Sequence, residues 1–178
     1  MAQTDITLLR PHLEHLPPPR PLPDGYALQV LGQADEPALA ELLSLVFEET
    51  WDEARVQTSL TRTADVRAVY GVLHGEVLVA TASSQTRPQR DPGAGFVHLV
   101  ATHPDHRGKG LAAALLGRVL EDFRARGDLR ARLDTQAERL PAIRTYLRFG
   151  FTPEYVHVGA DQRTVWSEIF QTLMSRAR

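Results

Sequence analysis

The chain has 178 residues, of which 43% are hydrophobic and 24% are charged, and this composition is typical of one soluble globular domain. The formal net charge of −2 gives no overall attraction for nucleic acid, and the lack of cysteine excludes disulfides, a cysteine nucleophile and thiolate metal ligands. The N-terminus lacks the pattern of a secretory signal, and no apolar run is long enough to span a membrane. We therefore expect a cytoplasmic protein without membrane or nucleic-acid partners.

Residues 1–24 contain six of the 12 prolines of the chain. Proline lacks the backbone N–H that helices and sheet ladders need, so this density predicts an extended N-terminal arm, followed by one domain over residues 25–178. Apolar residues within the arm suggest that part of it packs against the domain or against a partner. These residues are Ile6, Leu8, Leu9, Leu13 and Leu16.

Hydrophobic periodicity predicts the elements of the domain in chain order. The first half gives a strand, a helix, a shorter helix and a two-stranded hairpin, over residues 26–31, 35–47, 52–60, 67–73 and 76–86. A polar loop over residues 87–95 comes next. The second half gives a strand, a long helix, a strand, a short helix, a strand and a final helix, over residues 96–102, 110–126, 129–135, 141–149, 151–158 and 161–174.

The order of these elements favours an α/β fold built on a mixed sheet. Consecutive strands in the first half can pair as an antiparallel meander. The later strand–helix–strand unit requires a right-handed crossover, which makes its two strands parallel. Amphipathic helices are expected to cover the faces of this sheet.

A glycine-bearing loop, Arg107-Gly108-Lys109-Gly110-Leu111-Ala112, joins the strand at 96–102 to the long helix. Glycine lets the backbone approach a ligand closely, and unpaired amides at a helix N-terminus favour a phosphate or pyrophosphate. The loop is not a nucleotide P-loop, because no Ser or Thr follows Lys109-Gly110, and it lacks the third glycine of a dinucleotide fingerprint. The alternative interpretation is an ordinary tight turn between a strand and a helix.

A second motif lies one strand downstream, where Ala142, Tyr146, Gly150 and Phe151 form the pattern Ala-x-x-x-Tyr-x-x-x-Gly-Phe. Together with Leu99-Val100-Ala101-Thr102-His103-Pro104 and the loop at 107–112, it resembles the GCN5-related N-acetyltransferase (GNAT) superfamily over residues 26–158. The resemblance implies a mostly antiparallel sheet with one splayed parallel strand pair and flanking helices. It also implies acetyl-coenzyme A (acetyl-CoA) as co-substrate and a primary amine as acceptor.

The same resemblance assigns the coenzyme contacts. The backbone of Val100, Ala101 and Thr102 is expected to bind the coenzyme, with one N–H there donating to the thioester oxygen as it becomes negative. The pyrophosphate is expected on Arg107, Gly108, Lys109, Gly110, Leu111 and Ala112. Arg139 stands where the family commonly has asparagine, and we expect it to bind the coenzyme through a phosphate instead.

Two residues are the main catalytic predictions. Tyr146 matches the family tyrosine that often protonates the leaving sulfur, and the alternative is a buried tyrosine with a structural role. Period-two alternation puts His98, Val100 and Thr102 on one face of the strand, and a histidine suits amine deprotonation. A structural histidine with ordered water as the proton acceptor is the alternative, and Glu154 is a weaker candidate. The spacing of the histidines predicts no metal site.

The function expected from the resemblance is acetyl transfer from acetyl-CoA to a primary amine of a small-molecule acceptor, by direct attack in a ternary complex. The alternative is a coenzyme A-binding sensor or interaction module that has lost turnover. The acceptor wall is expected at residues 47–61, 87–93 and 152–160, whose mixed charges do not identify the amine. A homodimer is common in the family, and the proline arm or the apolar last helix could serve its interface.

Overall fold

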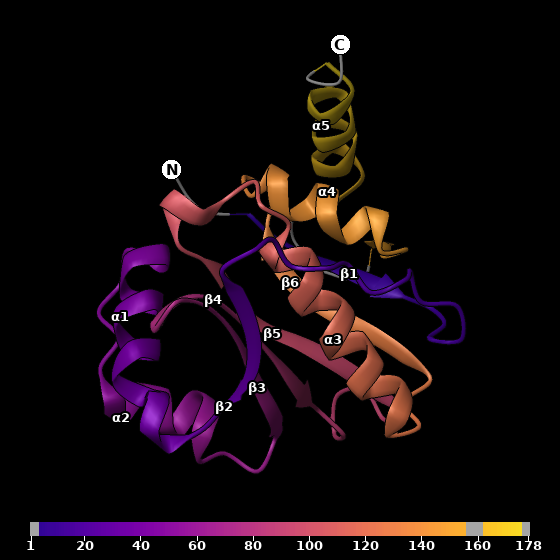
Figure 1. Ribbon diagram of the computed structural model, residues 1–178. Coiled ribbons are helices and arrows are strands. Elements are labelled where there is room, and N and C mark those ends of the chain that lie inside the picture. Colours follow the sequence, from indigo (N-terminus) through magenta and orange to yellow (C-terminus); the bar gives the residue numbers. More distant parts are fainter. Residues whose placement is uncertain (1–3, 156–161, 176–178) are drawn as a thin grey trace.

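A computed structural model describes residues 4–155 and 162–175 of the chain (Figure 1). Its sheet has the strand order β2-β3-β4-β5-β6-β1-β7. The strands are β1 (Asp5–Arg10), β2 (Tyr26–Leu31), β3 (Val66–His74), β4 (Val77–Thr86), β5 (Ala94–Thr102), β6 (Arg130–Gln136) and β7 (Thr152–Glu154). The helices are α1 (Glu36–Phe47), α2 (Glu53–Val56), α3 (Leu111–Ala125), α4 (Leu140–Arg148) and α5 (Gln162–Ser175).

The predicted mixed sheet is confirmed. Strands β5 and β6 pair in parallel, while β1 with β6, β1 with β7, and the successive pairs from β2 to β5 are antiparallel. The parallel pair is the one joined through α3, as the crossover rule requires. The predicted helix over residues 52–60 is instead the single turn α2 followed by a π-helical turn at Gln57–Thr61.

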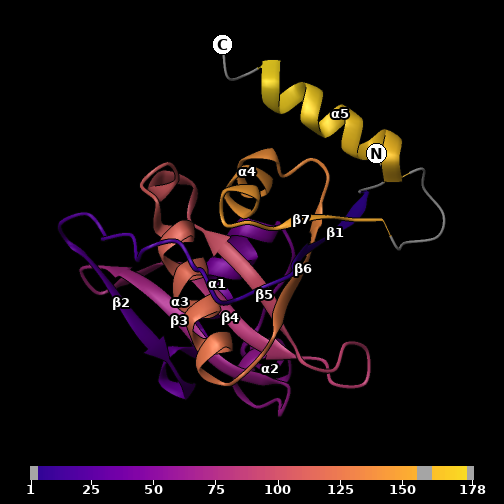
Figure 2. The ribbon, with the colours of Figure 1, turned by 90° about the vertical axis from the view of Figure 1, so that its right-hand side faces the viewer.

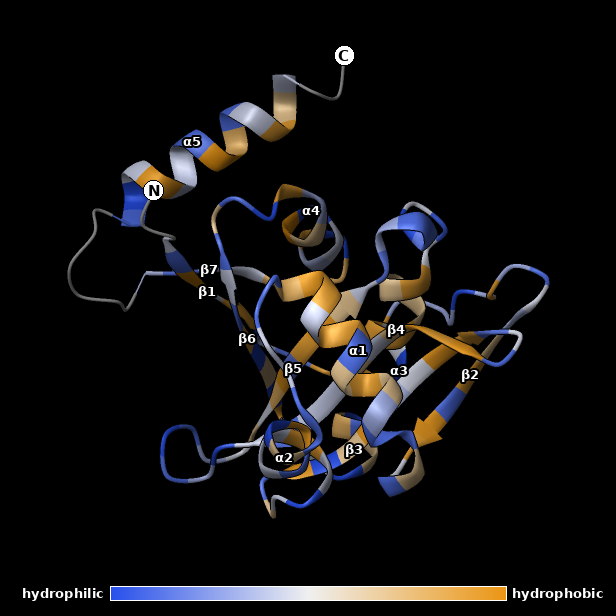
Figure 3. Ribbon diagram, turned by 90° about the vertical axis from the view of Figure 1, so that its left-hand side faces the viewer, coloured by the Kyte–Doolittle hydropathy of each residue, from blue (hydrophilic) through white to orange (hydrophobic). Residues whose placement is uncertain are grey.

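Helices cover both faces of the sheet and enclose two apolar clusters. Helix α3 packs on β3, β4 and β5 from one face, and α1 packs on β4 and β5 from the other, where Figure 3 shows it in front of the sheet. The apolar stripe predicted for α3 is buried, from Leu111 to Phe123. Helix α3 approaches β5 so closely that a Cβ atom at Gly95 would lie 2.3 Å from the Phe123 ring. Glycine at this position therefore allows α3 to lie this close to β5. The position of α3 in turn sets the position of the loop that precedes the helix.

Residues 5–10 of the expected N-terminal arm lie within the sheet, a pairing that the proline content did not predict. These residues form β1, which lies between β6 and β7 and pairs with both. Ile6 and Leu8 are fully buried in the cluster beneath α3. The physical reason is the position of the prolines: the first is Pro11, so every N–H of β1 is present for pairing. The extended, proline-rich part of the arm begins only after this strand.

The C-terminal elements follow the prediction in part. Strand β7 is shorter than the predicted strand at 151–158. Residues 156–161, which include the first residue of the predicted final helix, lie outside the described residues. Helix α5 packs against α4 and extends away from the sheet (Figures 1 and 2). Trp166 and Ile169 are buried in this contact, whereas Phe170 and Met174 are exposed. Across residues 4–155 and 162–175, no helix has the length and apolar character needed to cross a membrane.

Candidate functional site

The parallel strands β5 and β6 separate after a short paired segment. They pair only where Ala94–Phe96 lies beside Arg130–Arg132, and Figure 2 shows them diverging beyond it. A cavity of about 680 Å³ lies at this opening. Its lining includes residues of both strands, of β1, of the end of α1, and of α4. Because β6 does not pair with β5 beyond Phe96, the backbone groups on that side of β5 remain available to a ligand.

A β-bulge at Leu99 decides which side chains of β5 face the cavity together. Leu99 has a left-handed φ of 47°, and the register with β4 shifts by one residue at this point. His98 pairs with Ser83 and Ala101 with Thr81, so His98 lies on the same face as Ala101. Val100 instead packs in the cluster on the α3 side. The prediction that His98, Val100 and Thr102 share one face is therefore wrong, because the extra residue reverses the alternation.

Tyr146 reaches the cavity from α4. Its side chain is almost completely buried and meets the ring of Phe151 edge-on, at 6.1 Å between centroids. Burial raises the pKa of the Tyr146 phenol to about 12, and the charge of the nearby Arg139 acts in the opposite direction. The phenol therefore keeps its proton at neutral pH and can act only as a hydrogen-bond or proton donor toward a negative group.

The His98 side chain lines the cavity from the face of β5 opposite to the one on which Val100 packs. Burial lowers the pKa of His98 to about 4, with a further lowering from the Arg87 charge and partial compensation by Asp134. The imidazole is therefore neutral at physiological pH and has a free lone pair for a proton. It is also a weaker base than an exposed histidine, because its charged form is poorly solvated.

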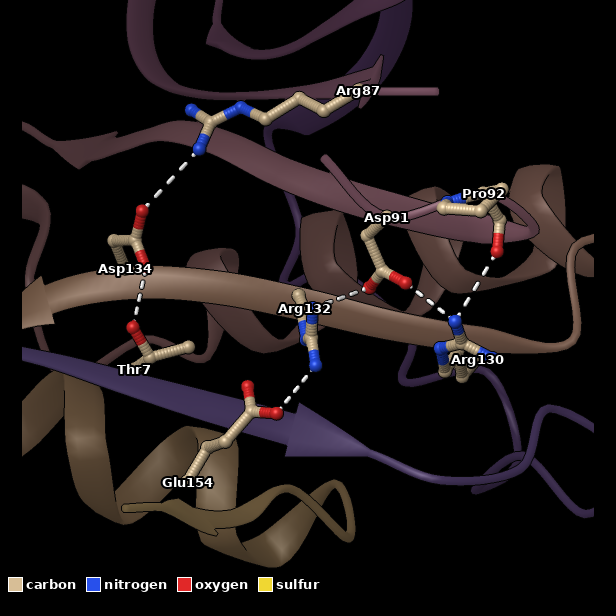
Figure 4. Close-up of polar contacts among 8 residues, drawn as sticks. All are labelled: Thr7, Arg87, Asp91, Pro92, Arg130, Arg132, Asp134 and Glu154. Atoms are coloured by element: carbon tan, nitrogen blue, oxygen red, sulfur yellow. Dashed lines mark hydrogen bonds and ion pairs between the residues drawn. The ribbon is translucent and has the colours of Figure 1, made fainter. Parts of the chain in front are cut away.

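Arg87 and Asp134 form the polar wall next to His98 (Figure 4). Asp134 accepts a hydrogen bond from the Thr7 hydroxyl at 2.7 Å and pairs with the Arg87 guanidinium at 3.3 Å. The guanidinium also lies over the Phe96 ring, 3.3 Å from its centroid. These contacts hold one carboxylate and one guanidinium at the cavity, where they can meet opposite charges on an acceptor.

A second ion-pair group lies beside this wall (Figure 4). Asp91 pairs with Arg130 and with Arg132, and Arg132 also pairs with Glu154. Glu154 is not part of the cavity lining. The carboxylate of Glu154, a candidate base at the acceptor cleft, pairs with Arg132 outside this lining. Arg130 and Arg132 thus hold two carboxylates beside the polar wall.

The glycine loop lies at the N-terminus of α3, outside the cavity lining. Gly108 and Gly110 have φ values of 78° and 82°, which L-residues rarely adopt. A Cβ atom at Gly108 would meet nothing within 4 Å. The first backbone bond into the helix is Ala114 N–H to Gly110 C=O, so the amides of Leu111, Ala112 and Ala113 lack intrahelical partners. This open, amide-rich loop fits a diphosphate.

The structure thus separates the predicted residues into two groups. His98, Val100, Tyr146 and Arg139 line the cavity, whereas Ala101, Thr102 and the loop at 107–112 do not. Arg139 contacts Gln136 and lies over the Phe47 ring, 4.8 Å from its centroid.

Asp134 and Thr7, which form part of the polar lining, were not among the predicted site residues. Asp134 continues the polar alternation of β6, which is a signal the sequence contains. No such signal places Thr7 beside it.

Of the segments expected at the acceptor wall, 47–61 contributes Phe47 and Glu49 to the lining, and 87–93 contributes Arg87. Residues 152–155 do not line the cavity, and residues 156–160 lie outside the described residues. Glu49 also pairs with Arg55 at 2.7 Å. Within the described residues, no group of acidic or histidine side chains is arranged to hold a metal ion.

The chain is similar to known acetyltransferases. The mycothiol acetyltransferase of Beutenbergia cavernae is 28% identical over 144 residues, which is 77% of this chain and 48% of that protein. N-acetyltransferase 8F1 of Rattus norvegicus is 30% identical over 120 residues, which is 62% of this chain and 54% of that protein. The chain spans about half the length of these curated relatives.

Solved structures and a family model complete the comparison. A GNAT-family protein of Novosphingobium aromaticivorans has a TM-score of 0.61 at 29% identity, covering 85% of this chain and 61% of that chain. The GCN5-related N-acetyltransferase of Sphaerobacter thermophilus has a TM-score of 0.68 at 23% identity, covering 85% and 49%, and supports the fold alone. Residues 36–151 match the model of the Acetyltransferase (GNAT) family. With this match over most of its length, the chain belongs to the GNAT family of acetyltransferases.

Proposed function

We propose that the protein is an acetyl-CoA-dependent N-acetyltransferase that acts on a primary amine of a small-molecule acceptor, by direct attack in a ternary complex. The observation that supports this most is the cavity at the opening between β5 and β6. A proton donor, Tyr146, and a neutral proton acceptor, His98, both line it.

The residues present fit the coenzyme. The loop at 107–112 offers unpaired amides and open space above Gly108 for the pyrophosphate. The β6-facing backbone of β5 near Val100–Thr102 offers hydrogen-bonding groups to the pantetheine and to the thioester oxygen. When bound, acetyl-CoA supplies the acetyl group as an activated thioester. The protein then has to orient that thioester, hold the amine and exchange two protons.

The acceptor enters on the His98 side in this proposal. Asp134 and Glu49 provide negative charge for an incoming ammonium group, and Arg87 and Arg139 provide positive charge for a second, anionic group. The amine must lose a proton as it attacks, and His98 is the predicted acceptor for that proton. Tyr146 donates to the sulfur as it leaves.

An assay of coenzyme thiol release with a panel of primary amines, combined with calorimetric binding of acetyl-CoA, tests the proposal. The panel contains amines with and without a carboxylate, because the cavity has charges of both signs. We expect binding of acetyl-CoA and amine-dependent thiol release with at least one class of amine. Binding without turnover across the panel would instead identify a coenzyme-binding sensor, and absence of binding would reject both functions.

A further inference from the structure

The proline-rich segment between β1 and β2 passes the coenzyme loop. Figures 1 and 2 agree that this segment runs from β1 past the N-terminal end of α3 to β2. It is held at both ends. After β1, Arg10 donates to the carbonyl of His15 at 2.6 Å, and Leu13 is buried. Leu16 and Leu22 pack against the cluster beneath α3. The segment is therefore attached to the domain along its length.

The end of the segment is tied to the loop itself. Tyr26, the first residue of β2, shares a hydrogen bond of 2.8 Å between its hydroxyl and His106 Nδ1. The Lys109 ammonium lies 5.8 Å from the centroid of the Tyr26 ring. The segment and the loop are thus joined by direct contacts, in addition to being neighbours in space.

Arg20 lies beside Gly110 of the loop. Its Cδ and Nη1 atoms lie 3.6 and 3.7 Å from the position that a Cβ atom would take at Gly110. Three consecutive prolines, Pro17 to Pro19, precede it and restrict the backbone that presents it. Within residues 4–155 and 162–175, no hydrogen bond or ion pair engages its guanidinium. An arginine beside unpaired helix amides, with its charge uncompensated, is suited to a phosphate.

We propose that Arg20 is a coenzyme ligand supplied by the N-terminal segment, and that it binds the pyrophosphate of coenzyme A together with the loop at 107–112. This inference rests on the proposed function, since it assumes that the loop holds the coenzyme. Residue 20 lies outside the region matched by the family model, which begins at residue 36. The family match therefore does not include this contact, which would give the proline-rich segment a role in binding.

Calorimetric binding of coenzyme A to the full chain tests this role with Arg20→Ala, Arg20→Lys and a control, Arg124→Ala. Arg124 is exposed near the other end of α3 and its loss changes the net charge equally. We expect Arg20→Ala to weaken coenzyme A binding by about tenfold, as for loss of one charge-assisted hydrogen bond, with partial recovery in Arg20→Lys. Arg124→Ala should bind as the wild type does.

Two further probes identify the group that Arg20 contacts. Dephospho-coenzyme A lacks the 3′-phosphate but keeps the pyrophosphate, so the loss in Arg20→Ala should persist with it. S-acetylpantetheine lacks all the phosphates, so its turnover should be the same in Arg20→Ala and in the wild type. The inference is overturned if Arg20→Ala matches Arg124→Ala or binds more tightly, or if its loss disappears with dephospho-coenzyme A. Failure of the wild type to bind coenzyme A would instead reject the proposed function.

Discussion

Tyr146 is a weak acid in its buried position, and this limits what it can do. The pKa of its phenol is about 12, whereas a thiol in water has a pKa of about 8.5. Full transfer of its proton to a thiolate in water would be unfavourable by about 5 kcal/mol. Burial in the same cleft also raises the pKa of the departing thiol, which reduces the difference between the pKa values of the thiol and the phenol. The phenol is thus suited to donate a hydrogen bond that strengthens as negative charge develops on sulfur.

Replacing Tyr146 by phenylalanine removes this donor and keeps the ring. We expect kcat to fall by about tenfold or more, with the affinity for acetyl-CoA nearly unchanged, since general acid catalysis typically contributes about a hundredfold or more. Steady-state kinetics and calorimetry measure the two effects. Tyr155→Phe is the matched control, because Tyr155 is exposed and outside the cavity lining. An unaltered kcat in Tyr146→Phe would reject the acid role.

His98 should make folding stability depend on pH. Its pKa in the folded protein is about 4, below the value of about 6.5 expected in the unfolded chain, so the unfolded state binds the proton first as pH falls. The free energy of unfolding should therefore decrease by about 2 kcal/mol between pH 7 and pH 5 because of this group. Urea unfolding of wild type and His98→Asn measures it.

The variant His98→Asn should lack this part of the pH dependence. The exposed His12→Asn should retain it and serves as the control. If the free energy of unfolding changes equally in the wild type and in His98→Asn between pH 7 and pH 5, the conclusion that His98 is buried and neutral is wrong. The kcat of His98→Asn separately tests the base role, because a merely structural histidine leaves kcat unchanged.

At the scale of elements, periodicity predicted most helices and strands of the domain but missed the irregularity that builds the site. The apolar stripe of α3 and the alternation in β6 repeat over many residues, so their signal is strong. The bulge at Leu99 is a single extra residue with no glycine or proline to mark it. A strictly alternating interpretation of β5 therefore grouped His98 with Val100 and Thr102, whereas the bulge puts His98 on the other face.

The glycine loop is an element whose conformation can be tested directly. Gly108 has a φ of 78° and open space around its Cβ position, so alanine there meets a backbone cost rather than a clash. We expect Gly108→Ala to lower the free energy of unfolding by about 1–2 kcal/mol and to weaken acetyl-CoA binding. Gly32→Ala is the control, since Gly32 has a φ of −136° and equally open space. Equal stability in the two variants would contradict the left-handed backbone conformation at Gly108.

At the scale of the whole molecule, β1 connects the N-terminal part of the described chain to its C-terminal part by strand pairing. It lies between β6 and β7 and places Thr7 opposite both Asp134 and Glu154. Sequence patterns gave no indication of this insertion, because the residues it brings together are more than 120 positions apart. The same insertion explains why Thr7 was missed as part of the polar wall, although Asp134 continues the visible alternation of β6.

The insertion of β1 predicts a large effect of a single residue near the N-terminus. Leu8 is fully buried, so Leu8→Ala should lower the free energy of unfolding by about 2–5 kcal/mol in one cooperative transition. Leu129→Ala, at a leucine that is 70% exposed, should change it by less than about 0.5 kcal/mol. Denaturant unfolding compares the two. Similar small changes in both variants would show that β1 is not integral to the sheet.

The central claim of this account is that the opening between β5 and β6 holds acetyl-CoA. A crystal structure of the protein with coenzyme A tests it most directly. We predict pantetheine between the two strands, its thiol end toward Tyr146, and the pyrophosphate on the loop at 107–112 with Arg20 beside it. Coenzyme density at any other surface, with this opening empty, would contradict the claim.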